Sequence, residues 1–357
     1  MIELKVDLGT RSYPILIGDG LLGTPDLLAP YVGGRQVAVI TNTTVGPLFL
    51  DKLMASLGRV AADVIELKDG ERFKTLDTYA GVIDALMDKR HNRTTTLVAL
   101  GGGVIGDLAG FAAATFQRGV AFVQVPTTLL AQVDASVGGK TGVNHPDGKN
   151  MIGAFHQPRC VLADTATLAT LPAREYRAGL AEVVKYGVIW SAAFFAELER
   201  QIDALNQRDA AVLADVIRES CAIKAAVVAE DEREQGRRAI LNYGHTFAHA
   251  LETLTGYEQL LHGEAVAIGM VLAADCAWRH GLLDEASVQR IRGLVSALGL
   301  PTAMPAAIDP SAALTAMGMD KKVVEGRLRL VLPERIGAVR VTDQVERATV
   351  LTTLEAD

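Results

Sequence analysis

Histidines gather in one short stretch of the sequence. His245 and His249 lie four residues apart in NYGHTFAH (242–249), and His262 follows in LHGEA (261–265). Residues at i and i+4 project from the same face of a helix. Imidazoles combined with a carboxylate form zinc sites that keep a fourth position open for a substrate. The spacing therefore predicts a catalytic metal site in the second half of the chain.

The spacing leaves the choice of ligands open. His245 and His249 could bind the metal as an adjacent pair, completed by Glu264 or Glu182, or one of the pair could relay protons. Glu182 precedes Lys185 by three residues in GLAEVVKYG (179–187), so the two share one face of a predicted helix. The helix is otherwise largely apolar, which indicates burial, and a buried charge needs a charged partner or a metal.

A glycine-rich turn follows a predicted strand in the first half. In GGGVIGD (101–107), Gly101, Gly103 and Gly106 have the G-x-G-x-x-G spacing, which brings backbone amides close to a pyrophosphate. The dinucleotide fingerprint requires an acidic residue at the end of a strand about 20 residues later. No such residue is present here, and the turn follows the third predicted strand. The motif suggests a dinucleotide, with a purely structural turn as the alternative.

Polar loops follow the neighbouring predicted strands. The loop DGERFK (69–74) carries charges that could hold ribose and phosphate, and Thr127 and Thr128 come directly after another strand. The stretch 134–150 holds Asp134, Lys140, Lys149 and Asn150 among glycines, a composition that packs no core and exposes backbone amides to a phosphate. It is no P-loop, because Asp134 stands where the first glycine is required.

These residues need a scaffold, and the hydrophobic pattern predicts one. Up to about residue 150, β-rich runs alternate with helical patterns, at residues 37–40, 64–67, 97–100 and 122–125. This rhythm predicts a mostly parallel, Rossmann-like α/β domain over residues 1–155. After Pro158, helical periodicity dominates at residues 174–190, 210–230 and 264–280, with a short β pair at 326–341. Residues 156–357 are therefore predicted to form a mainly α-helical domain, with ligands bound in a cleft between the two.

The overall composition argues against several classes of partner and site. A formal net charge of −7 and a pI near 5.6 argue against a nucleic-acid partner. The three cysteines are far apart and odd in number, so we expect neither disulfides nor a thiolate zinc site. No signal peptide and no run of about 18 apolar residues is present, so we expect a cytoplasmic protein that binds no membrane.

Taken together, the motifs resemble those of the 3-dehydroquinate synthase family, within the sugar phosphate cyclase superfamily, along nearly the whole chain. The matching segments, in the family's order, are DGERFK (69–74), GGGVIGD (101–107), FQRGV (116–120), VPTTLLAQVDASVGGKTGVN (125–144), GKNMIGAFHQP (148–158), GLAEVVKYG (179–187), IKAAVVAEDERE (223–234), RAILNYGHTFAHALE (238–252), LHGEAVAIGM (261–270) and DKK (320–322).

The resemblance implies a set of roles for residues of this chain. It implies Glu182, His245 and His262 as ligands of Zn²⁺ or Co²⁺, with His249 handling protons beside them. It implies NAD bound by Asp69, Gly70, Glu71, Arg72, Phe73, Lys74, Gly103, Val104, Ile105, Gly106, Asp107, Thr127, Thr128, Lys140, Lys149, Thr167, Leu168, Ala169 and Thr170. The implied catalytic residues are Lys140, Lys185, Lys224, Glu234, Asn242 and His249.

The resemblance also implies the substrate and the reaction. The substrate is 3-deoxy-D-arabino-heptulosonate 7-phosphate, held by Arg118, Asp134, Lys140, Asn150, Lys185, Lys224, Arg238, Asn242, His249 and either Lys321 or Lys322. NAD oxidises a ring hydroxyl transiently so that phosphate can leave, the hydride returns, and ring opening with aldol closure gives 3-dehydroquinate in the shikimate pathway. A homodimer is also implied.

Two other functions stay open from the residues alone. A metal- and NAD-dependent polyol dehydrogenase would consume NAD and would not need the cations Lys140, Lys149, Lys185, Lys224 and Arg238. Another sugar phosphate cyclase would share nearly all motifs and differ in a few substrate contacts.

Arg237 and Lys322 are interpreted as solvent-exposed charges.

Overall fold

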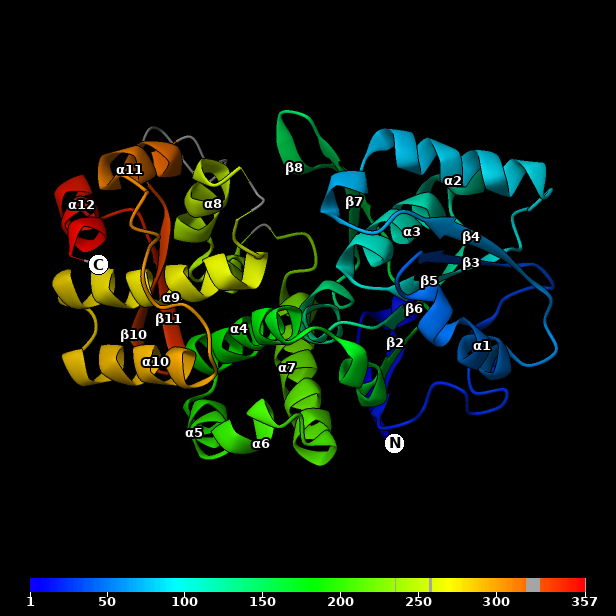
Figure 1. Cartoon of the computed structure of the whole chain (residues 1–357), viewed down its shortest axis with the longest axis horizontal. Coiled ribbons are helices and arrows are strands. Elements are labelled where there is room, and N and C mark those ends of the chain that lie inside the picture. The colour runs from blue at the N-terminus through cyan, green and yellow to red at the C-terminus, as the bar shows by residue number, and fades with distance from the viewer. Residues whose placement is uncertain (235, 257–258, 319–327, 357) are drawn as a thin grey trace. The chain divides into compact units, whose positions relative to one another are not determined.

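The computed structural model describes residues 1–234, 236–256, 259–318 and 328–356, and these form two compact units. Unit 1 comprises residues 1–171 and 213–233, and unit 2 comprises residues 172–212 and 234–357 (Figure 1). The contacts thus place residues 156–171 and most of a later helix with the first unit. The division at residues 155/156 stays a prediction for the functional domains.

Unit 1 is built on a seven-stranded sheet whose strand order is β1-β2-β9-β6-β5-β3-β4. Only β1 runs antiparallel to its neighbour, so the prediction of a mostly parallel, Rossmann-like sheet is confirmed. The strands are β1 Ile2–Val6, β2 Tyr13–Gly18, β3 Val37–Asn42, β4 Ala62–Leu67, β5 Thr96–Gly101, β6 Ala121–Pro126 and β9 Cys160–Asp164.

Helices cover both faces of this sheet, because the central strands are apolar on both sides. On one face α1 (Gly46–Leu57) packs Leu53 against Val39 and Val98. On the other, α2 (Leu76–Asp88) and α3 (Gly103–Thr115) pack against Ile40 and Leu97. A near-continuous apolar run in each strand is what a doubly covered parallel sheet requires.

The loops that the sequence singled out follow the carboxyl ends of neighbouring strands. Residues 69–74 follow β4, the glycine turn follows β5, and Thr127 follows β6. The chain passes from β3 to β4 on one side and returns to β5 on the other side of β3. Such a switch in strand order opens a crevice at the carboxyl edge, where open α/β sheets bind ligands.

The stretch 134–150 was predicted to be a glycine-rich segment that packs into no hydrophobic core, and the structure differs. It starts in a short π-helical turn, η5 (Ala131–Ala135), and continues into the antiparallel hairpin β7 (Lys140–His145) and β8 (Gly148–Phe155). Val143 is fully buried (0% exposed) against α3. The hairpin therefore does contribute to a core, although its glycines had suggested otherwise.

Unit 2 is mainly helical, as predicted. Helix α9 packs against α4, α8, α10, α12 and β10, so it forms the centre of this unit. The helices are α4 Ala173–Ile189, α5 Ala192–Arg200, α6 Ile202–Asn206, α8 His245–Leu254, α9 His262–Arg279, α10 Glu285–Ala297, α11 Pro310–Gly318 and α12 Arg347–Glu355. The hairpin β10 (Leu330–Arg335) and β11 (Ala338–Thr342) corresponds to the predicted β pair.

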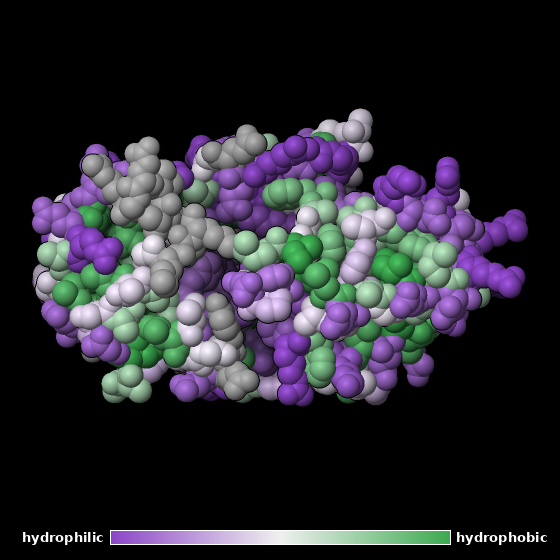
Figure 2. All heavy atoms as spheres, turned by 90° about the horizontal axis from the view of Figure 1, so that it is seen from above, coloured by the Kyte–Doolittle hydropathy of each residue, from purple (hydrophilic) through white to green (hydrophobic). Residues whose placement is uncertain are grey.

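The long helix α7 (Ala210–Glu230) contributes most of its length to unit 1. Short helical turns complete the description: η1 Gly9–Arg11, η2 Ala29–Tyr31, η3 Glu71–Phe73, η4 Phe116–Arg118, η6 Thr165–Thr170 and η7 Arg237–Asn242. Within the described residues, none of the helices has the length and apolar character that crossing a membrane requires. The face drawn in Figure 2 mixes hydrophilic and hydrophobic side chains.

Candidate active site

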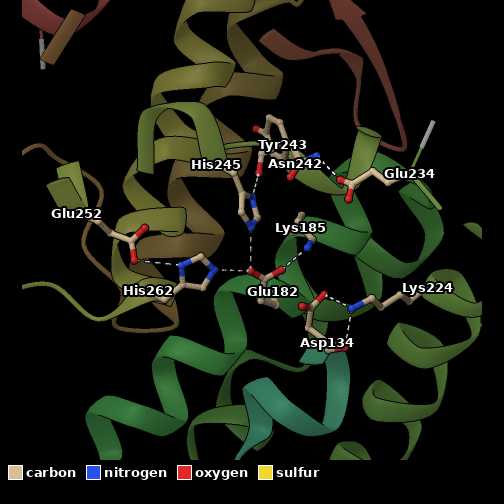
Figure 3. Close-up of polar contacts among 10 residues, drawn as sticks. All are labelled: Asp134, Glu182, Lys185, Lys224, Glu234, Asn242, Tyr243, His245, Glu252 and His262. Atoms are coloured by element: carbon tan, nitrogen blue, oxygen red, sulfur yellow. Dashed lines mark hydrogen bonds and ion pairs between the residues drawn. The ribbon is translucent and has the colours of Figure 1, made fainter. Parts of the chain in front are cut away.

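Three side chains of unit 2 converge on one point. Glu182 from α4 lies with its Oε1 3.6 Å from Nε2 of His245 and 3.7 Å from Nε2 of His262 (Figure 3). One ligand atom from each residue falls within 4.8 Å of the others, and this is the one group of three such side chains found among the described residues. Two imidazoles and a carboxylate at this separation can hold a single divalent cation.

Close helix packing brings these residues together. A side chain on Gly263 would place its Cβ 1.9 Å from the carbonyl oxygen of Ala178, so the start of α9 touches the backbone of α4. Gly269 is equally tight, since a Cβ there would lie 2.1 Å from the carbonyl oxygen of Gly244. Gly244 itself has φ +79°, a conformation that favours glycine, directly before His245 opens α8. The glycines thus set the approach of α4, α8 and α9.

Each histidine turns its other ring nitrogen toward an oxygen. Nδ1 of His245 lies 3.0 Å from the carbonyl oxygen of Tyr243, and Nδ1 of His262 lies 3.3 Å from Oε1 of Glu252. An acceptor at Nδ1 holds the proton there, which leaves the Nε2 lone pair for a metal. The donor set therefore fits Zn²⁺ or Co²⁺.

Charges around the cluster are tightly paired. Lys185 lies one helical turn after Glu182 and forms an ion pair with its Oε2, and both side chains are buried (2% and 1% exposed). Burial alone would lower the pKa of His262, but its hydrogen bonds and charge interactions with Glu182 and Glu252 raise that pKa to about 10. The two carboxylates therefore favour positive charge at the position where a cation would sit.

The geometry favours one of the ligand sets that the spacing left open. Both carboxylate oxygens of Glu264 accept hydrogen bonds from Arg174 at 2.7 Å, and one also accepts from the backbone N–H of Leu261 at 2.8 Å. Glu264 thus caps α9 instead of joining the cluster. His249 meets the ring of His245 edge-on at a centroid distance of 5.9 Å and is not part of the three-residue group.

The other predicted residues of unit 2 lie on the segment that leads into α8. Asn242 donates from Nδ2 to Oε1 of Glu234 at 3.0 Å. Arg238 is almost fully buried (1% exposed). Arg237 is exposed and stacks over Trp190, in agreement with its interpretation as a surface charge. Lys321 and Lys322 lie outside the described residues.

In unit 1, Lys74 connects three of the predicted segments. Its ammonium forms an ion pair with Asp107 at the start of α3 and donates to Oδ1 of Asn150 on β8 at 2.6 Å. Burial raises the pKa of Asp107, and the charge of Lys74 opposes this effect. Asn144 continues the network, because it donates to Glu71 at 2.7 Å and accepts from the backbone N–H of Asn150 at 2.9 Å.

Neighbouring side chains pack closely against the backbone at the start of α3. A Cβ on Gly102 would come within 3.1 Å of Thr128, and one on Gly106 within 3.1 Å of Gln124, so both positions need a small residue. Asp69 is fixed by Asn42 and Thr44 at 2.8 and 2.9 Å. These contacts hold the loops after β3, β4, β5 and β6 in a defined arrangement, with amides of the α3 N-terminus available to a pyrophosphate.

Two further contacts organise the carboxyl edge. Lys224 on α7 pairs with Asp134 of η5 at 2.9 Å and also donates to its backbone oxygen at 2.5 Å. Gln132 of the same turn donates from Nε2 to Pro126, Asp164 and Thr167 at 3.0–3.1 Å. The predicted cofactor segment Thr167, Leu168, Ala169 and Thr170 thereby sits in η6, directly after β9 and tied to the end of β6.

One predicted residue of unit 1 is not brought to this edge. Arg118 is exposed in η4, after α3 has crossed the sheet and before β6 begins at Ala121, so it lies at the amino-terminal edge. Lys140 opens β7, and Lys149 is the second residue of β8, in the hairpin that also carries Asn150. The roles of all three stay predictions.

Sequence reasoning missed Glu252 and Tyr243. Glu252 lies seven residues after His245 and three after His249 on α8, a spacing that places all three along one helix face. This spacing was the available signal. Tyr243 acts through its backbone carbonyl, which leaves no trace in the residue type.

Two solved synthases share this fold from end to end. A 2-deoxy-scyllo-inosose synthase complexed with carbaglucose-6-phosphate, NAD⁺ and Co²⁺ matches with a TM-score of 0.90 and 29% identity, covering 99% of both chains. The 2-epi-5-epi-valiolone synthase ValA of Streptomyces hygroscopicus subsp. jinggangensis 5008, with NAD⁺ and Zn²⁺ bound, gives 0.88 and 30%, covering 98% of this chain and 99% of that one. The fold is that of the sugar phosphate cyclases.

Sequence comparison narrows the class to one family. The family models described as 3-dehydroquinate synthase N-terminal and C-terminal match residues 64–178 and 179–323. A curated 3-dehydroquinate synthase of Pseudomonas entomophila (strain L48) is 55% identical over 357 residues, which is 100% of this chain and 98% of that protein. The chain belongs to the 3-dehydroquinate synthase family.

Proposed function

We propose that this protein is a phosphate-eliminating lyase that converts 3-deoxy-D-arabino-heptulosonate 7-phosphate into 3-dehydroquinate and phosphate. The observation that carries the proposal is the convergence of Glu182, His245 and His262 beside the buried Lys185, in a chain that matches its relatives over its full length. We propose NAD and Zn²⁺ or Co²⁺ as cofactors, in line with the groups named for the two solved synthases.

The three ligands have distinct surroundings, which supports their joint role. Glu182 offers Oε1 toward the two histidines, while its Oε2 is held by Lys185. The pair with Lys185 thus leaves one carboxylate oxygen for the cation and fixes the direction in which it points. When bound, the divalent ion would polarise substrate hydroxyls, and NAD would accept and return one hydride.

The loops at the carboxyl edge of unit 1 are proposed to hold NAD. They are residues 69–74, Gly103 to Asp107, Thr127, Thr128 and 167–170, with Lys140 and Lys149 nearby in sequence on the hairpin. Glycines and side-chain hydrogen bonds hold these loops in place. The backbone amides at the start of α3 would then donate to phosphate oxygens.

Cations and amides are proposed to bind the substrate. Lys185, Lys224 and Arg238 are buried and carry the positive charge that a phosphate and a carboxylate need, and a simple dehydrogenase would have no use for them. Asn242 and Glu234 form a hydrogen-bonded pair that can orient one hydroxyl. Asp134, Lys140, Asn150 and His249 complete the proposed set, and Arg118 is not included, because it lies at the amino-terminal edge of the sheet.

The deciding experiment follows phosphate and NADH together. Incubation with the heptulosonate phosphate, catalytic NAD and Zn²⁺ or Co²⁺ should release phosphate in many turnovers without net NADH, and 3-dehydroquinate should accumulate. Accumulation of NADH in proportion to product would instead indicate a polyol dehydrogenase. Turnover of a different sugar phosphate, with none of the heptulosonate, would indicate another cyclase of the superfamily.

Two coarser properties complete the proposal. We expect a cytoplasmic homodimer that acts on a small molecule. Light scattering after gel filtration would give twice the 37.9 kDa mass of the chain if the dimer forms.

A further inference from the structure

The carboxylate of Glu252 faces the ring nitrogen of His262 that points away from Glu182. Oε1 of Glu252 lies 3.3 Å from Nδ1 of His262, and Nε2 of the same ring lies 3.7 Å from Glu182 (Figure 3). Glu252 is 3% exposed, near the end of α8. A carboxylate is costly to bury, so its position beside the ring calls for a reason.

His245 provides the comparison. Its Nδ1 faces the backbone carbonyl of Tyr243 at 3.0 Å, a neutral oxygen that can only accept a hydrogen bond. The two histidines thus share one geometry, with an acceptor at Nδ1 and Nε2 toward Glu182. The acceptors at Nδ1 differ in charge, because the one at His262 is a carboxylate and the one at His245 is a backbone carbonyl.

We propose that Glu252 is a positioning residue that holds the Nδ1–H tautomer and the ring orientation of His262 and so strengthens its bond to the divalent cation. The inference rests on the proposed function, since it presupposes metal binding at Glu182, His245 and His262. A carboxylate behind a ligating imidazole raises its basicity, and loss of such a partner typically weakens metal binding 10–100-fold.

Glu264 shows that this contact is not a general consequence of nearby acids. It lies only two residues from His262, yet its oxygens are bound to Arg174 and to the backbone N–H of Leu261. Glu252 comes from another helix and still reaches the ring. Glu264→Gln therefore removes one negative charge close to His262 without changing the ring's partner, and it serves as the matched control.

The test measures metal binding directly. The full-length apoenzyme, freed of metal by chelation, is titrated with Co²⁺, and the visible absorbance gives the Kd for wild type, Glu252→Gln, Glu252→Asp and Glu264→Gln. We expect Glu252→Gln to raise the Kd about 10–100-fold, Glu252→Asp to recover part of the loss, and Glu264→Gln to stay within about threefold.

Proton NMR of the cobalt-loaded enzyme separates positioning from simple loss of structure. The exchangeable Nδ1–H of His262 should shift in Glu252→Gln, while that of His245 stays in place. A folded Glu252→Gln variant with wild-type Kd and an unshifted His262 resonance would overturn the inference. Equal Co²⁺ affinity of wild type and His262→Ala would instead remove the proposed metal site itself.

Discussion

The ammonium of Lys74 donates a hydrogen bond to Oδ1 of Asn150 at 2.6 Å, although 76 residues separate them in the sequence. The same ammonium pairs with Asp107. One side chain therefore joins the loop after β4, the start of α3 and the β7–β8 hairpin. Because Lys74 occupies the oxygen of Asn150, the amide nitrogen is the group left to donate to a ligand.

Replacing Lys74 by Met should loosen this junction. The change removes the ammonium that Asp107 and Asn150 share. Asn150 is exposed and can bind water instead, so the cost comes from the half-buried carboxylate of Asp107, about 1–3 kcal/mol. We expect the free energy of unfolding in urea to fall by roughly 2 kcal/mol and NAD to bind more weakly. Lys89→Met is the control, since Lys89 pairs with Asp63 on the surface and should change stability by less than about 1 kcal/mol. Equal effects of both variants would contradict the junction.

Much of the sheet of unit 1 could be predicted from the sequence, because the central strands of a parallel sheet are largely apolar. β3, β5 and β6 stood out for that reason. The β7–β8 hairpin could not be recognised, since β8 exposes Met151 and Phe155 and half-buries Ile152, so both faces are apolar and no alternation is visible.

The metal cluster was predictable in its residue types but not in its membership. The spacing of His245 and His249 favours a pair on one helix, whereas in the structure His262 from the next helix groups with His245 and Glu182. This membership depends on the contact of Gly263 with α4 and on the hydrogen bonds between Glu264 and Arg174. Neither contact between distant segments is encoded in local periodicity.

Exhaustive chelation should abolish turnover, and Zn²⁺ or Co²⁺ should restore it. His262→Ala should lose most of the bound metal, because one of three ligands is removed. His249→Ala should keep its metal, since His249 stands outside the group. Metal content per chain by mass spectrometry checks both. Full occupancy in His262→Ala, or loss of metal in His249→Ala, would restore the pairing of His245 with His249.

Gly103→Val should weaken NAD binding by at least about tenfold while the protein still folds. A Cβ at Gly103 would lie 3.4 Å from that of Ala135, an ordinary contact, so the sheet should tolerate it. The branched side chain would nevertheless stand where amides must approach the pyrophosphate. Gly81→Val on α2 is the control, because a side chain there meets nothing within 4 Å. Calorimetric titration with NAD compares the two, and an unchanged affinity in Gly103→Val would exclude this turn from the site.

Arg238 provides the test that separates phosphate recognition from redox chemistry. A charge-assisted hydrogen bond contributes roughly 1.5–3 kcal/mol, or about one to two powers of ten in affinity. Arg238→Gln preserves part of the volume of this buried side chain and should weaken a phosphonate analogue of the substrate by that factor. The affinities for NAD and metal should stay close to those of the wild type.

Two comparisons make the Arg238 result specific. A neutral analogue of the same shape should bind Arg238→Gln and wild type equally, because only the anion interacts with the lost charge. Arg237→Gln, one residue earlier, should leave both analogues unaffected, since its guanidinium stacks on Trp190 at the surface. If both analogues weaken equally in Arg238→Gln, the residue supports the fold of η7 and not the phosphate. That outcome would strengthen the case for a polyol dehydrogenase, which needs no buried arginine for its substrate.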